Sequence, residues 1–169
     1  MISKPKIGVL AFSDGDPDAF ELLKPIVERE YNYVVDALRD SGEVELVLGE
    51  RIVNSVEVAK EEAQKMVAQN VDGMIFSYGV FAFPNFSAIA AKFGKGPYML
   101  VAGFKPDWPG MVAMLAAGGA LHHLGIEHFR TAGDVKDPAI LQKLITFAKC
   151  ARVVNRLKGS TYGLIGGRS

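Results

Sequence analysis

Three aspartates stand close together after the first apolar run of the chain, residues 6–12. Asp14, Asp16 and Asp18 lie within the stretch SDGDPD. Carboxylates this close together could bind a cation or the hydroxyl groups of a sugar. They could equally form a solvated turn that caps a helix, because Asp is a preferred N-cap residue. A calcium loop of the EF-hand type is excluded, since its twelfth position needs Glu and here carries Pro25.

Aromatic side chains occupy two further loops. Phe81 and Phe83 follow the apolar run 71–78 with a spacing that fits no helix or strand able to bury both, and Trp108 lies in a loop between two prolines. An aromatic ring can pack on the apolar face of a sugar while nearby carboxylates accept its hydroxyls. Alternatively, the rings cover the end of a sheet or a subunit contact. The candidate substrate-binding residues are Asp14, Asp16, Phe81, Phe83 and Trp108.

The sequence offers few other groups for catalysis. His122 and His123 are adjacent on a predicted helix, where side chains point about 100° apart, so they are poor candidates for a shared metal. The glycines of GLIGGRS lack the spacing and the Lys-Ser/Thr pair of a phosphate loop. The single Cys150 is predicted to be a small core residue of the last helix. We therefore assign no catalytic and no metal-binding residue to this chain.

The elements that position the candidates are predicted from alternating patterns. Near-continuous apolar runs indicate parallel strands buried on both faces, and helical segments separate them. Asp16 before Pro17 predicts the start of the first helix, and Pro25 predicts a kink or a split within it. The predicted strands are residues 6–12, 43–49, 71–78, 97–104 and 126–133.

These elements predict a three-layer α/β/α fold with a five-stranded parallel sheet in the flavodoxin-like order 2-1-3-4-5. In such sheets, ligands bind beyond the carboxyl ends of the strands, near the switch in strand order. The aspartate loop and both aromatic loops follow strands one, three and four. We therefore expect all of them at the same edge of the sheet.

Size and composition exclude several classes of protein. The chain has 169 residues, and 19 basic residues balance 19 acidic ones, so it lacks the charge expected of a nucleic-acid-binding or anionic-membrane-binding protein. No apolar stretch reaches the roughly 18 residues needed to span a bilayer. One cysteine allows no internal disulfide. We therefore expect one domain with a sizeable core and a cytoplasmic location.

Three stretches of the sequence resemble L-fucose isomerases. They are PKIGVLAFSDGD, AGFKPDWPGMVAMLAAGGALHHLGI and LQKLITFAKCARVVNRLKGSTYGLIGGRS, and the resemblance extends over essentially the whole chain. The last stretch resembles the bridge from the first N-terminal domain of that family into the second. L-arabinose isomerases share this architecture, and the sequence resembles them almost as well.

The resemblance implies a division of the chain. Residues 1–158 would form the first N-terminal α/β domain, and 159–169 would begin a second domain that is truncated here, with 161–165 as its first strand. The family interconverts aldoses and ketoses through an enediol, using a divalent metal, typically Mn²⁺. Its catalytic carboxylates and metal ligands lie in the C-terminal part, so the fragment alone is expected to be inactive.

The resemblance also implies an assembly and a site. The first domain of the family helps to close the sugar site of a neighbouring subunit in a hexamer, and an aromatic residue that packs on the sugar matches Phe81. The position at which the fucose enzymes bring an Arg carries Asp16 here, which reverses the charge. We therefore expect a homo-oligomeric sugar isomerase. The alternatives are a stand-alone flavodoxin-like sugar- or nucleotide-binding module without catalysis, and a purely structural oligomerisation domain.

Overall fold

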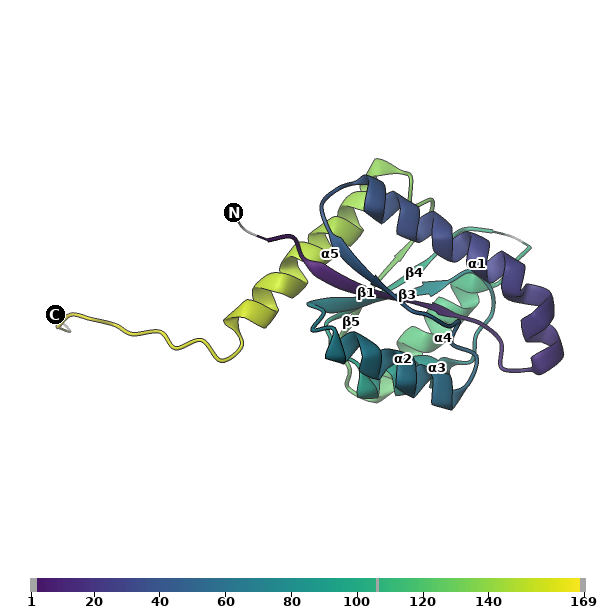
Figure 1. Cartoon of the computed structure of the whole chain (residues 1–169), viewed down its shortest axis with the longest axis horizontal. Coiled ribbons are helices and arrows are strands. Elements are labelled where there is room, and N and C mark those ends of the chain that lie inside the picture. The colour runs from purple at the N-terminus through teal and green to yellow at the C-terminus, as the bar shows by residue number, and fades with distance from the viewer. Residues whose placement is uncertain (1–2, 106, 168–169) are drawn as a thin grey trace.

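The computed structural model describes residues 3–105 and 107–167. Strands and helices alternate along the chain, and the five strands form one parallel sheet in the order β2-β1-β3-β4-β5 (Figure 1). This order confirms the predicted flavodoxin-like α/β fold. The elements are β1 Lys6–Phe12, α1 Pro17–Asp40, β2 Glu45–Leu48, α2 Val56–Ala68, β3 Gly73–Tyr78, α3 Pro84–Phe93, β4 Tyr98–Ala102, α4 Gly110–His123, β5 His128–Ala132 and α5 Pro138–Leu157.

The sheet is covered on both faces, as its apolar strands require. Helices α2, α3 and α4 lie on one face, and α1 and α5 lie on the other (Figure 1). Because side chains alternate along a strand, Phe76 packs under α2 to α4 and its neighbour Ile75 packs under α1 and α5. The rings of Phe12 and Tyr78 stack in the first layer, with centroids 5.3 Å apart. These two layers form the core.

The register aligns the carboxyl ends of four strands. Phe12 of β1 pairs with Tyr78 of β3, Tyr78 with Ala102 of β4, and Ala102 with Ala132 of β5. The loops that follow these strands therefore begin at the same level. This alignment is what brings the predicted site residues to one edge of the sheet.

Local sequence signals determine where the helices start. Tertiary packing overrides another local signal, the proline inside α1. Asp16 caps α1 by accepting hydrogen bonds from the backbone N–H groups of Asp18 and Ala19, at 3.1 and 2.9 Å. The predicted split at Pro25 does not occur, because α1 runs unbroken from Pro17 to Asp40. An interior proline costs about 3 kcal/mol, but it points to solvent here, and the buried face of the helix on the sheet offsets that cost.

The prediction for Cys150 is wrong. Its side chain is exposed, whereas the neighbouring Ala148 and Ala151 are fully buried on the inner face of α5. Successive side chains on a helix point about 100° apart, and this angle places Cys150 outside the buried stripe.

The segment after α5 contains neither helix nor strand in its described part, residues 158–167. It extends away from the body of the domain (Figure 1), and Tyr162, Leu164 and Ile165 are each more than four-fifths exposed. The predicted strand at 161–165 was expected to pair with a second domain, so this pairing stays a prediction. None of the described helices combines the length and the apolarity needed to cross a membrane.

Candidate functional site

Three phenylalanines form a cluster beyond the end of β3. The Phe81 and Phe83 rings meet edge to face with centroids 5.6 Å apart, and Phe83 meets Phe86 in the same way at 5.9 Å. Phe86 is buried in α3 and anchors the group, while Phe83 is 42% exposed and Phe81 is half-buried. Edge-to-face pairs hold rings in fixed orientations. The cluster therefore presents a rigid, partly exposed apolar surface at the ligand edge.

The aspartate loop lies directly beside this cluster. A Cβ placed on Gly15 would come within 2.8 Å of the Phe86 ring, so the glycine lets this loop approach α3 closely. Asp14 accepts a hydrogen bond from the N–H of Asp16 at 2.8 Å, and Asp16 caps α1. Both carboxylates thus have local structural roles. Their binding of sugar hydroxyls stays a prediction.

Trp108 lies apart from the phenylalanine cluster. Its half-buried ring packs with Ala11, Val27 and Val80, in a small apolar group between α1 and the ends of β1 and β3. This contact covers the end of the sheet, and substrate binding by Trp108 stays a prediction. The structure therefore brings Phe81 and Phe83 close to the aspartate loop and places Trp108 against a different part of the edge.

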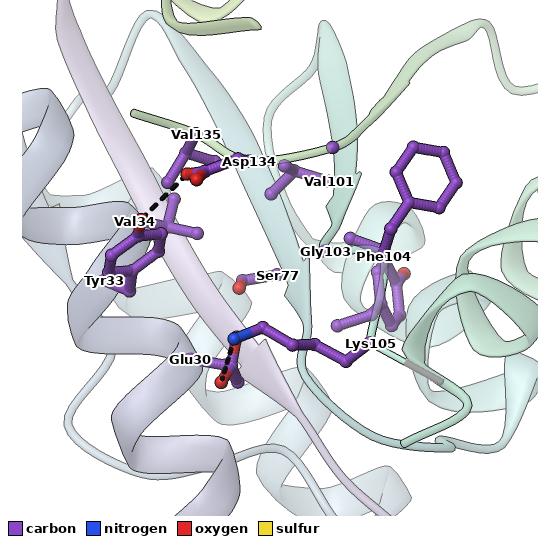
Figure 2. A pocket seen from close by; sticks show the side chains of 13 residues that line it. Glu30, Tyr33, Val34, Ser77, Val101, Gly103, Phe104, Lys105, Asp134 and Val135 are labelled. Atoms are coloured by element: carbon purple, nitrogen blue, oxygen red, sulfur yellow. Dashed lines mark hydrogen bonds and ion pairs between the residues drawn. The ribbon is translucent and has the colours of Figure 1, made fainter. Parts of the chain in front are cut away.

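A cavity of about 350 Å³ opens at the same edge, on the side of the sheet covered by α1 and α5 (Figure 2). Glu30 and Tyr33 reach it from α1, Ser77 from β3, Lys105 from the loop after β4, and Asp134 from the loop after β5. Sequence reasoning missed all five residues. A signal was present in α1, where Glu30 stands on the same stripe as the buried Val27 and Val34.

Two polar pairs face one another across this cavity. Glu30, whose side chain is only 11% exposed, accepts hydrogen bonds from Arg29 at 3.0 and 3.1 Å and lies 3.6 Å from the Lys105 ammonium. On the other side, the Tyr33 hydroxyl donates to Asp134 at 2.8 Å. Ser77 lies between the two pairs (Figure 2). For a ligand, the cavity provides hydrogen-bond acceptors on both sides and one flexible cationic donor.

The Tyr33–Asp134 pair shifts the pKa of both members. The hydrogen bond to Asp134 raises the pKa of Tyr33. The backbone N–H of Lys136, followed by the Tyr33 hydroxyl, lowers the pKa of Asp134. At neutral pH the tyrosine is therefore a neutral hydroxyl and the aspartate is an ionised carboxylate.

The described residues do not fit a metal ion. No group of three or more His, Cys, Asp or Glu side chains is placed to hold one within residues 3–105 and 107–167. His122 and His123 lie in the exposed last turn of α4 with ring centroids 6.5 Å apart, and the carboxylates of Asp14 and Asp16 accept hydrogen bonds from nearby backbone N–H groups. A manganese ion would need ligands from elsewhere.

The parallel sheet, with an aromatic cluster and a cavity at its carboxyl edge, defines a flavodoxin-like α/β domain. Comparison with protein families identifies which domain of this class it is. Residues 4–159 match the family model of the L-fucose isomerase first N-terminal domain, and the chain belongs to this family. Comparison with curated proteins gives no match.

Proposed function

We propose that this chain serves as the first N-terminal domain of a metal-dependent aldose–ketose isomerase of the L-fucose isomerase type. The observation that carries the proposal is the family match over residues 4–159. Within the described residues, no group of three or more His, Cys, Asp or Glu side chains is placed to hold a metal ion. In this proposal the general bases, the Mn²⁺ ion and its ligands belong to other domains, and this domain contributes to substrate binding and assembly.

The role of the domain in substrate binding rests on the phenylalanine cluster. Phe81 and Phe83 would form an apolar wall against one face of the sugar, in a site completed by a neighbouring subunit of a homo-oligomer, which we take to be a hexamer. The buried Phe86 holds both rings, directly or through Phe83, so the wall needs no reordering when the sugar binds. Asp14 and Asp16 on the adjacent loop would accept hydroxyl groups, and Trp108 would support the edge.

The proposal also predicts that the isolated domain has no isomerase activity. Residues 1–158 would form the first domain, and 159–169 would lead into a second domain. Without the metal and the general bases, an enediol mechanism has no means of moving the proton between carbons. Residues 1–169 alone should therefore convert no aldose, with or without Mn²⁺, and the complete enzyme would act in the cytoplasm.

A domain exchange tests this function. Residues 4–159 would replace the first domain of an active L-fucose isomerase, and conversion of L-fucose and L-arabinose to their ketoses would be measured with Mn²⁺. We expect a folded oligomer with measurable activity on at least one aldose. Phe81→Ala in this chimaera should lower kcat/KM about ten- to a hundredfold, from the loss of about 1–3 kcal/mol of apolar contact.

The matched control is Phe129→Ala, which truncates an equally large ring that is 57% exposed on β5, away from the cluster. It should leave kcat/KM unchanged. An inactive but correctly assembled chimaera, or equal effects of the two substitutions, would refute the proposal. Mixing Phe81→Ala subunits with subunits lacking the metal ligands should restore part of the activity if the ring acts across a subunit boundary.

The alternative is a stand-alone sugar- or nucleotide-binding module without catalysis, and the cavity of Figure 2 supports its sugar-binding form. Such a module would bind its ligand without contributing to turnover. The two functions differ in the chimaera, because a binding module would not depend on Phe81 for isomerisation. An active chimaera that loses turnover with Phe81→Ala excludes this alternative.

A further inference from the structure

The cavity between α1 and the ends of β3, β4 and β5 has no part in the proposed sugar wall. It is about 350 Å³, and none of Asp14, Asp16, Phe81, Phe83 and Trp108 lines it. Its polar residues come from four separate elements and converge on one space (Figure 2). A concave site with a few convergent polar groups among apolar walls is the usual form of a small-molecule site.

Ser77 is a largely buried residue that lines this cavity. It is only 3% exposed, and it lies between the Glu30–Lys105 pair and the Tyr33–Asp134 pair (Figure 2). A hydroxyl group can both donate and accept a hydrogen bond. The Ser77 hydroxyl can therefore bond in either direction to a molecule inside the cavity.

Glu30 provides an acceptor on the same side. Its Oε1 takes the contacts from Arg29 and Lys105, while its Oε2 points toward Gly103, 3.8 Å from where a Cβ on that glycine would stand. Within the described residues, Oε2 makes no hydrogen bond. A carboxylate this buried is costly unless its oxygens are satisfied. The absence of a side chain at Gly103 leaves room for a donor to reach it.

Asp134 provides the matching acceptor on the opposite side. Its Oδ1 accepts from the Tyr33 hydroxyl at 2.8 Å and from the N–H of Lys136 at 2.9 Å, which leaves Oδ2 without a hydrogen bond among the described residues. Two carboxylates thus flank the hydroxyl of Ser77. The ammonium of Lys105, which is half-exposed, is the one cationic donor among the lining residues described.

The charged and polar groups of the cavity determine whether a charged or an uncharged ligand fits best. Glu30 and Asp134 would repel a phosphate or a carboxylate, and Lys105 is already balanced by Glu30. A simple cation could pair with the carboxylates but would not use the ammonium or the apolar walls formed by Val34, Val101 and Val135. An uncharged molecule with several hydroxyl groups uses them all, because each hydroxyl both donates and accepts.

We propose that this cavity binds an uncharged polyhydroxylated small molecule, a pentitol or a monosaccharide. The cavity volume lies at the lower end of the range for small-molecule sites, which suits five or six carbons. Hydroxyl groups of the ligand donate to Glu30 and Asp134 and accept from Lys105, and Ser77 takes part in either direction. The proposal does not rest on the isomerase function, since it concerns different residues.

Titration of the ¹⁵N-labelled chain with ribitol tests the proposal, with inorganic phosphate and methylammonium as charged probes. Ribitol should shift the backbone amides of Ser77, Gly103 and Gly133 saturably, whereas the charged probes should not saturate them. Ser77→Ala and Lys105→Met should each weaken the apparent affinity about three- to tenfold, as expected for one lost hydrogen bond. Lys92→Met, which removes an exposed lysine of α3 that lies away from the cavity, is the matched control and should have no effect.

Three results would overturn the proposal. One is the absence of saturable shifts with ribitol up to about 0.1 M, a concentration beyond any specific site of this kind. Another is a saturable shift of the same amides by phosphate or by methylammonium. The third is a response centred on Phe81 and Phe83 that is unchanged in Ser77→Ala and Lys105→Met. That result would place ribitol on the aromatic wall and would leave the isomerase proposal intact.

Discussion

Gly110 holds the start of α4 against the end of β3, and replacing it tests how the ligand edge is built. It is the first residue of α4, and a Cβ placed there would stand 2.4 Å from the carbonyl oxygen of Tyr78. Ordinary contact begins at 3.4 Å. Gly110→Ala must therefore push α4 and β3 apart by about 1 Å, directly before the loop that carries Phe81.

Gly119 provides the matched control in the same helix. It is exposed, and apart from its chain neighbours and the backbone of its own helix turn, no described heavy atom lies within 4 Å of a Cβ placed there. Gly119→Ala should stabilise the domain by about 0.5–1 kcal/mol, because alanine loses less backbone freedom than glycine in a helix interior. Gly110→Ala should destabilise it by about 1–3 kcal/mol, the usual cost of overpacking. The same chemical change thus acts in opposite directions at two sites of one helix.

Thermal and urea unfolding followed by circular dichroism would measure both effects. For a domain of this size, 1 kcal/mol shifts Tm by about 2–4 °C. Gly119→Ala should therefore raise Tm by about 1–4 °C, and Gly110→Ala should lower it by about 2–12 °C. An unchanged or raised Tm for Gly110→Ala would refute the close approach of α4 to Tyr78. A lowered Tm for Gly119→Ala would refute the open environment of that position.

Three further predictions concern single residues. Burial alone would raise the pKa of Glu62, but hydrogen bonds from Lys65, the N–H of Glu50 and Arg51 lower it. Its contribution to stability is therefore present at neutral pH and lost as the pH falls below about 4.5, so Glu62→Gln should flatten the acid limb of a plot of unfolding free energy against pH. Asp16→Ala should cost about 0.5–2 kcal/mol in urea unfolding through the loss of the α1 cap, and an unchanged midpoint would contradict the capping geometry. Cys150, which is exposed, should react fully with a thiol reagent in the folded chain, and modification only after unfolding would place it in the core.

The candidate site could be predicted only in part. Phe81, Phe83 and the aspartate loop were identified because each follows an apolar strand, and aligned parallel strands bring such loops to one edge. The cavity lined by Glu30, Ser77 and Asp134 could not be identified in this way. These residues are separated by tens of positions in the sequence, and each alone resembles an ordinary polar residue of a helix, strand or loop.

The sequence by itself determined the elements and their order, because the signals involved are local. Apolar runs specify the buried strands, and caps such as Asp16 specify where the helices begin. Tertiary structure decided what local signals cannot express. Packing of α1 on the sheet kept the helix continuous through Pro25, and the rotation of α5 turned Cys150 outward. The docking of α1 beside β3 placed the buried carboxylate of Glu30 at the same cavity as the hydroxyl of Ser77, since only packing brings together residues that are distant in the sequence.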